Sequence, residues 1–198
     1  MDARGIPKQL IASVAVAIML TGTAVAGPLQ DGMDAYSRGE YDQALRLWKP
    51  LADGGLAVAQ YNVGVMHATG RGVPRDDSEA MKWYRMAADQ GHASGQFNLG
   101  LMYADGNGVA QDFAKAAEWY RKAAEQCHTD AKYNLGSMHF HGRGVLQDYV
   151  LAHLWFNLAA SRGHEEAVKG RDTVSNRMTP DQIAEAQRMA REWKPLAE

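Results

Sequence analysis

The segment AQYNVGVMHATGRGVPRDDSEAMKWYRMAADQGH, residues 59–92, occurs three times in this chain of 198 residues. The second copy, GQFNLGLMYADGNGVAQDFAKAAEWYRKAAEQCH, covers residues 95–128, and the third, AKYNLGSMHFHGRGVLQDYVLAHLWFNLAASRGH, covers residues 131–164. The residues that return every 36 positions include Asn62, Gly64, Gly72, Asp76 and Trp83 of the first copy. Such a period is typical of repeat proteins, in which each unit buries its apolar faces against its neighbours.

Each copy predicts two helices joined by a glycine-containing loop. In the second half of a copy, small and aromatic residues recur at positions i, i+3, i+4, i+7 and i+8, which lie on one face of a helix. In the first copy these residues are Ala80, Trp83, Tyr84, Ala87 and Ala88. Asp76 stands where a carboxylate can accept hydrogen bonds from the free N–H groups of that helix. The first helix is expected to run for about three turns from Ala59 to Gly70, because glycine tolerates the left-handed conformation that ends helices.

Two further features concern the glycines of the first helices and the segment upstream of the three copies. Gly64, Gly100 and Gly136 are expected to let the backbone of the first helix approach the aromatic rings of the second helix. Upstream of the three copies, Ala44 keeps the alanine of the pattern, but the tryptophan of that segment, Trp48, falls one place later. We therefore interpret this upstream segment as an irregular opening unit.

One helix pair cannot bury its apolar faces alone, whereas stacked pairs can, so we predict an all-α fold, an α-solenoid of antiparallel helix pairs. A helix start at Thr179-Pro180-Asp181-Gln182, with a threonine cap, a first-turn proline and a capping-box glutamine, predicts a C-terminal capping helix. The expected organisation is an opening pair at residues 27–55, repeats at 56–91, 92–127 and 128–163, and capping helices at 164–198.

Residues 1–26 have the features of a secretory signal peptide. Arg4 and Lys8 precede a small and apolar run, and Ala24-Val25-Ala26 forms an A-x-A exit. We expect cleavage after Ala26, hence a periplasmic or secreted protein with no stable membrane span after cleavage. The alternative is an uncleaved membrane anchor, for which the run up to Ala26 is at the short limit.

The three copies resemble the Sel-one-like repeat family, a relative of the tetratricopeptide repeat. The resemblance rests on a G-x-G-V-x-x-D loop and a W-x-x-x-A-A helix that recur in register through residues 59–164, and residues 34–55 resemble a degenerate tetratricopeptide-like unit. Departures include Cys127 at a glycine position. The resemblance implies a tetratricopeptide-like superhelix, an exported bacterial member of the family, and a protein-interaction scaffold that usually lacks catalysis of its own.

Composition and motifs argue against nucleic-acid binding, a disulfide framework, metal binding and catalysis. The net charge is −2, which excludes a polybasic nucleic-acid binder, and the single cysteine excludes a disulfide framework. His164-Glu165-Glu166-Ala167-Val168 lacks the second histidine of the zinc-binding H-E-x-x-H motif, and neither S-x-x-K nor G-x-S-x-G occurs. We interpret His92 and His128 as turn residues. The sequence therefore predicts no catalytic residue, no cofactor site and no metal site.

Three columns of residues on the first helices are candidates for lining a concave groove that binds a protein or peptide. Asparagine can pair with a peptide backbone, and methionine adapts to varied side chains. The alternative is that asparagine forms a hydrogen-bond ladder between repeats and methionine fills the core. The recurrence fits both roles, but we favour this alternative because repeat positions usually serve the structure. The candidate residues are Asn62, Asn98 and Asn134, then Met66, Met102 and Met138, and finally Tyr61, Phe97 and Tyr133.

We therefore expect a non-enzymatic scaffold of the bacterial cell envelope that holds a protein or peptide in its groove. Two alternatives stay open, a cell-wall or β-lactam-processing hydrolase and a secreted effector that binds host proteins. Cys127 adds the possibility of a disulfide between two molecules, since a lone thiol in an oxidising compartment can pair only with another chain or stay free.

Overall fold

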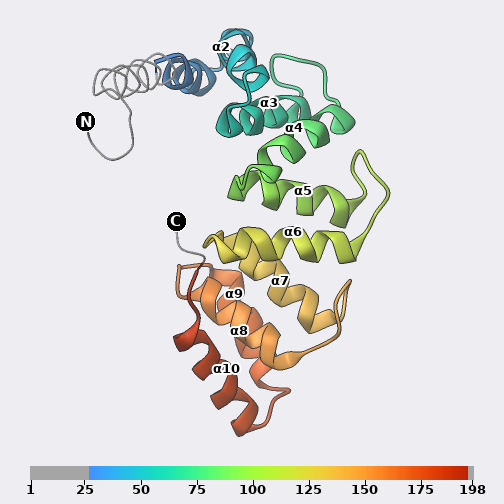
Figure 1. The fold of residues 1–198 in the computed structure, drawn as a ribbon. Coiled ribbons are helices and arrows are strands. Elements are labelled where there is room, and N and C mark those ends of the chain that lie inside the picture. The colour runs from blue at the N-terminus through green and yellow to red at the C-terminus, as the bar shows by residue number, and fades with distance from the viewer. Residues whose placement is uncertain (1–26, 196–198) are drawn as a thin grey trace, which may run out of the picture.

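The computed structural model describes residues 27–195, and every regular element in that range is a helix (Figure 1). The predicted signal peptide and its cleavage site after Ala26 lie outside the described residues. Residues 27–37 form the first described helix. The helices that follow are α2 (Tyr41–Asp53), α3 (Ala57–Thr69), α4 (Asp77–Asp89), α5 (Ala93–Asp105), α6 (Phe113–Glu125), α7 (Thr129–His141), α8 (Tyr149–Ala160), α9 (Glu165–Ser175) and α10 (Pro180–Glu192).

The helices stack in chain order, so the predicted α-solenoid is confirmed. Each of α3, α5 and α7 is followed by a partner helix that packs against it and against the next member of the series, as α4 packs on α3 and α5. We call residues 27–37, α3, α5, α7 and α9 the first helices, and α2, α4, α6 and α8 the second helices. The loops within the three repeats all lie on one side of the stack (Figure 1).

Local sequence signals begin and end the helices as expected. The carboxylates of Asp76, Asp112 and Asp148 accept a hydrogen bond from the backbone N–H three residues later and so cap the second helices. The glycines that end the first helices have left-handed backbones, with φ of 69° at Gly70 and 75° at Gly106. The first helices begin two residues earlier than expected, at Ala57 in the first repeat.

A close contact between glycine and an aromatic ring joins the two helices of each repeat. A Cβ atom added to Gly64 would lie 2.7 Å from Tyr84, one added to Gly100 would lie 2.7 Å from Tyr120, and Gly136 and Phe156 stand in the same relation at 2.8 Å. No side chain fits there without displacing the ring or the helix. The expected close approach of the backbones is therefore confirmed.

In the opening unit, the place of the aromatic residue is explained by this contact between glycine and ring, and not by the tryptophan position of the three repeats. A Cβ atom added to Gly32 would collide with the ring of Trp48, so Trp48 is the counterpart of Tyr84 and not a displaced Trp83. Trp119 also differs from Trp83 and Trp155, which occupy the same repeat position. Trp83 and Trp155 are 7% and 8% exposed, but Trp119 is only partly buried and the Lys122 ammonium lies 4.1 Å from its ring.

Histidines connect successive repeats, a role that the sequence analysis missed when it interpreted them as turn residues. The Nδ1 atoms of His92, His128 and His164 accept hydrogen bonds from the N–H groups of Gly95, Ala131 and Ala167 and so cap α5, α7 and α9. Each imidazole also stacks on an aromatic ring of the preceding first helix. The centroid distances are 4.9 Å for Tyr61–His92, 4.4 Å for Phe97–His128 and 4.5 Å for Tyr133–His164.

Buried glutamines form a second connection between repeats. The Gln90 amide donates to the Gln60 side chain, and Gln126 donates to Gln96, each at 2.7 Å. In the third repeat Lys132 occupies the corresponding place and is only 2% exposed. Its ammonium lies 4.2 Å from the ring centroid of Trp193, so the C-terminal segment replaces the glutamine of the next repeat.

The C-terminal helix packs back on α8. Leu154 and Leu158 are buried, although the same repeat positions in α6 carry exposed Glu118 and Lys122. Met189, Ala190 and Trp193 of the C-terminal segment pack against this core cluster. The capping box at Thr179 and Gln182 is present as predicted. The cap therefore covers the side of the last second helix, while α9 continues the stack of first helices by one more.

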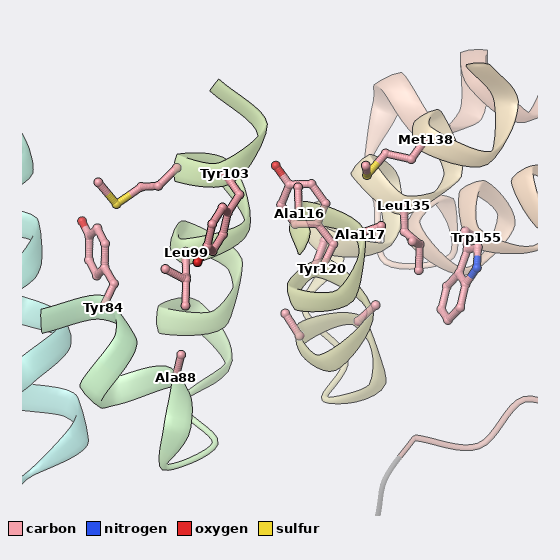
Figure 2. Packing of buried hydrophobic residues seen from close by; sticks show 14 of the residues in the cluster. Tyr84, Ala88, Leu99, Tyr103, Ala116, Ala117, Tyr120, Leu135, Met138 and Trp155 are labelled. Carbon is pink, nitrogen blue, oxygen red and sulfur yellow. The ribbon is translucent and has the colours of Figure 1, made fainter. Parts of the chain in front are cut away.

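Side chains of α4 to α8 form one continuous core (Figure 2). Leu99 and Tyr103 of α5 lie between Tyr84 and α6, and Leu135 and Met138 of α7 continue the layer toward Trp155 (Figure 2).

Cys127 lies at the end of α6 and has φ of 67°, the only positive value for a non-glycine residue in the described part of the chain. The thiol is free and half-buried.

We predict that Gly100→Ala destabilises the protein, because the new methyl group must displace the Tyr120 ring or the helix. Overpacking of this kind costs about 1–3 kcal/mol of unfolding free energy. Urea denaturation followed by circular dichroism measures it, with Ser94→Ala in the same helix as the control. Unchanged or higher stability, as helix propensity alone would give, would contradict the contact.

We also predict that acid lowers stability. Burial lowers the pKa of His92, His128, His139 and His153 below the ordinary value. Unfolded histidine takes up a proton near pH 6.5, whereas these folded histidines resist until a lower pH, so unfolding binds protons and becomes easier as pH falls below 6.5. Between pH 7.5 and 5 we expect Tm to fall by about 4 °C or more.

Thermal melts across this pH range check the prediction. His128→Asn keeps an N-cap that does not titrate, so its Tm should depend less on pH than that of the wild type, whereas His141→Asn at an exposed position should leave the dependence unchanged. A Tm that is constant from pH 7.5 to 5 would mean that the buried imidazoles are not coupled to folding.

Candidate binding groove on the first-helix face

The first helices leave one face partly open along the stack. In α3 the half-buried residues Tyr61, Asn62 and Val65 lie on one side of the helix, whereas Val63 on the opposite side and Met66, one turn after Asn62, are buried. The same alternation returns in α5 and α7 because the repeat has a constant length. We call this partly open side the first-helix face.

Pockets lie on this face between successive first helices, each with an aromatic ring of a second helix in its lining. The pocket between residues 27–37 and α3 includes Trp48 and has a volume of about 240 Å³. The pocket between α5 and α7 includes Tyr120 and measures about 370 Å³. The pocket between α7 and α9 includes Phe156 and measures about 290 Å³. The ring that contacts the helix glycine therefore also lines a pocket.

The predicted asparagine column lies partly in these pockets and partly between repeats. Asn62 lines the pocket next to residues 27–37, and Asn134 lines the pocket between α5 and α7. Burial raises the pKa of the Tyr84 and Tyr120 hydroxyls, and side-chain hydrogen bonds with Asn98 and Asn134 oppose this increase. Asn98 and Asn134 thus lie near the second helix of the preceding repeat.

The methionine column lies in the core. Met66 is 0% exposed, and Met102 and Met138 are each 6% exposed. Met138 borders the pocket between α5 and α7, whereas Met66 and Met102 belong only to core clusters. This placement supports packing as the main role of the column.

The aromatic column both connects successive repeats and lines pockets. Tyr61, Phe97 and Tyr133 stack on the histidine caps and are tilted against the rings of Tyr84, Tyr120 and Phe156 at 5.6–5.8 Å. Tyr61 and Tyr133 also line pockets, each with its ring partly exposed. Their recurrence is therefore explained by the connection between repeats, and their exposed edges contribute apolar surface to the face.

The pockets also contain residues outside the three predicted columns. Val65, Leu101 and Ser137 share one repeat position, and Ser137 lines two adjacent pockets. Arg143, in the loop after α7, lines the pocket between α5 and α7. Val65, Leu101 and Ser137 could have been predicted from the 36-residue period, because they lie one helical turn after Tyr61 and its equivalents.

Residues suited to metal binding are dispersed in the part of the chain that the structure describes. No three His, Cys, Asp or Glu side chains between residues 27 and 195 gather closely enough to hold a metal ion. His164, which begins the incomplete zinc motif, uses Nδ1 to cap α9. Within the same residues, no helix is long and apolar enough to cross a membrane.

Comparison with protein families and solved structures identifies related molecules. The Sel1 repeat model matches residues 57–92, 93–126 and 129–164. A crystal structure of a Sel1 repeat protein from Oxalobacter formigenes is 31% identical, with a TM-score of 0.73 over 83% of this chain and 70% of that chain. No curated protein matches the chain significantly.

Two other solved structures share the fold. A protective antigen present in uropathogenic Escherichia coli strains, which displays an SLR fold, is 29% identical, with a TM-score of 0.52 over 87% of this chain. The match covers 46% of the antigen, so this chain spans less than half of its length. Helicobacter pylori cysteine rich protein B is 21% identical, with a TM-score of 0.52 over 66% of this chain and 93% of that chain, and shows likeness of fold alone.

Proposed function

The chain belongs to the Sel1 repeat family, and we propose that it is a non-enzymatic scaffold of the bacterial cell envelope that holds an extended segment of a partner protein along its first-helix face. Sel1 repeats mediate protein interactions. The observation that carries the proposal for this chain is the row of pockets between successive first helices.

The pockets suit side chains of an extended segment better than a cofactor. At about 240–370 Å³ they lie near the lower limit of small-molecule sites, which occupy roughly 300–1,000 Å³. Asn62 and Asn134 supply amides that can bond to a peptide backbone, and aromatic rings supply apolar contact at low conformational cost. A segment crossing several repeats would fill one pocket after another.

We predict that Ser137→Arg weakens partner binding tenfold or more, because the arginine side chain enters two adjacent pockets from a half-buried position. A tenfold loss corresponds to 1.4 kcal/mol. The measurement compares partner recovery by cross-linking and affinity purification from the native envelope. Circular dichroism melts of the same samples should show that the fold is kept.

Met86→Arg is the matched control, since Met86 is 46% exposed on a second helix, away from the pockets. It should leave partner recovery unchanged. The opposite pattern, loss with Met86→Arg and retention with Ser137→Arg, would place binding on the second helices. Turnover of a β-lactam or of peptidoglycan by the purified protein would favour the hydrolase alternative.

The envelope location rests on the A-V-A exit before Gly27. We predict that mass spectrometry of the natively expressed protein finds Gly27 as the first residue. A mature chain that still begins at Met1 in the membrane fraction would contradict export by cleavage. Non-reducing electrophoresis of the same sample tests whether Cys127 joins two molecules or stays free, because a disulfide requires a band of twice the mass that reduction removes.

A further inference from the structure

We propose that the pocket between residues 27–37 and α3 binds a large apolar side chain of the partner segment, and that Arg71 beside it pairs with an acidic side chain next to that residue. This inference rests on the proposed function of the first-helix face and specifies the partner's chemistry. The partner class is therefore a protein with an internal segment in which a large apolar residue adjoins Asp or Glu.

The lining of this pocket is apolar and uncharged. Met33, Tyr36, Trp48, Tyr61, Asn62 and Val65 form it, and Asn62 is the only amide among them. The other two pockets differ, since one contains Asp105 and Arg143 and the other contains Glu166 and Lys169. Met33 is 49% exposed, so apolar surface is accessible from solvent at this pocket. One large side chain matches its volume of about 240 Å³.

The pocket is already formed without a ligand. The Trp48 indole N–H donates to the Leu29 carbonyl oxygen at 3.2 Å, and Trp48 is 3% exposed. Its ring lies 5.6 Å from Tyr36, and Gly32 allows the helix backbone to approach its edge. Because these rings are held by the fold, a partner side chain can enter without the entropy cost of ordering the site.

Arg71 is a charged group next to Tyr36 of this pocket. Its Nη1 atom donates to the Tyr36 hydroxyl at 2.7 Å, and the guanidinium carbon lies 5.6 Å from the Tyr36 ring and 5.4 Å from the Tyr41 ring. Tyr36 therefore has two roles: its side chain lines the pocket, and its hydroxyl positions the Arg71 guanidinium. The Arg71 side chain is exposed.

Arg71 differs from Arg38 and Arg75 in its charge partners. Arg38 pairs with Glu40 at 2.8 Å and Arg75 pairs with Asp77 at 3.0 Å, whereas no carboxylate among residues 27–195 lies within 4.0 Å of Arg71. Guanidinium groups bind carboxylates through two parallel hydrogen bonds, and only one donor of Arg71 is used by Tyr36. Its remaining donors can face a ligand carboxylate.

An internal acidic side chain fits this site better than a chain terminus. Capture of a C-terminal carboxylate commonly uses a cluster of free backbone N–H groups. Here the N–H of Arg71 donates to the Met66 carbonyl oxygen at 3.1 Å, and the N–H of Asp76 donates to His67 at 3.0 Å. The first-helix face also continues past the pocket across α5 and α7, so the segment can extend beyond it.

The test uses the exported protein, labelled with ¹⁵N, and short peptide probes. The probes are acetyl-Gly-Phe-Glu-Gly-amide and the same peptide with Gln or Lys in place of Glu. Binding is followed by the indole N–H signal of Trp48, assigned among five tryptophans. We expect the Glu peptide to shift this signal with a Kd about threefold to fivefold lower than that of the Gln peptide, and the Lys peptide to bind more weakly still.

Two pairs of variants separate charge from pocket. Arg71→Gln should abolish the preference for Glu over Gln, while Arg143→Gln, the same change at the equivalent loop position two repeats later, should keep it. Val65→Trp should fill the pocket and remove the response of Trp48 to all peptides, while Leu101→Trp at the next repeat should leave it intact. Melting curves verify that each variant folds.

Several results would overturn the proposal. Equal affinity for the Glu and Lys peptides would remove the role of Arg71, and a Trp48 signal that no peptide shifts would remove the pocket. Tighter binding of acetyl-Gly-Gly-Phe with a free carboxylate would assign the site to chain termini. Nuclear Overhauser contacts between Trp48 and residues before Gly27 in the full chain would make that segment the occupant. If Ser137→Arg still abolishes partner recovery in any of these cases, the proposed groove function stands and only this inference fails.

Discussion

The fold depends on one steric condition, the absence of a side chain where the first helix of each repeat meets the aromatic ring of the second. At Gly100 the Tyr120 ring occupies the space of a Cβ atom, and the same holds at Gly64 and Gly136. The close approach buries the ring between helices, where dispersion and hydrophobic burial act on a large surface. It also leaves the ring exposed to the pockets beside the first helices, so the element that stabilises the pair also shapes the face proposed to bind a partner.

Connections between repeats use polar groups that are satisfied within the stack. A histidine such as His128 caps a helix with Nδ1 and stacks its ring on Phe97 of the repeat before, so one side chain fixes both the start of a helix and its neighbour's position. Gln96 and Gln126 add a partly buried hydrogen bond. Because each of these contacts joins adjacent repeats only, stability in such an array is expected to pass from neighbour to neighbour.

At both ends of the array, other side chains replace the contacts that join repeats. Lys132 stands in place of a ladder glutamine and contacts Trp193, and Leu154 and Leu158 stand in place of exposed polar residues and are covered by the C-terminal segment. At the other end, the opening pair lacks the glycine loop and brings Tyr36 and Met33 to the edge of an apolar pocket. The two ends are therefore chemically different, and within residues 27–195 the N-terminal end presents an apolar pocket beside an arginine, Arg71, that pairs with no carboxylate.

The sequence by itself determined the helix pairs, their caps and the solenoid, because the 36-residue period, the glycines and the Asp76 series are local signals that act within one repeat. It could not decide between groove and packing for Asn98 or Met102, since recurrence is the same for both roles. It also missed His92 as a cap, the equivalence of Trp48 with Tyr84, and the fold-back of α10. Those depend on which side chains meet across repeats, and such distances are set by helix packing in three dimensions. The pairing of Tyr36 with Arg71, 35 residues apart, is of the same kind: only the stacked structure brings the guanidinium to the pocket.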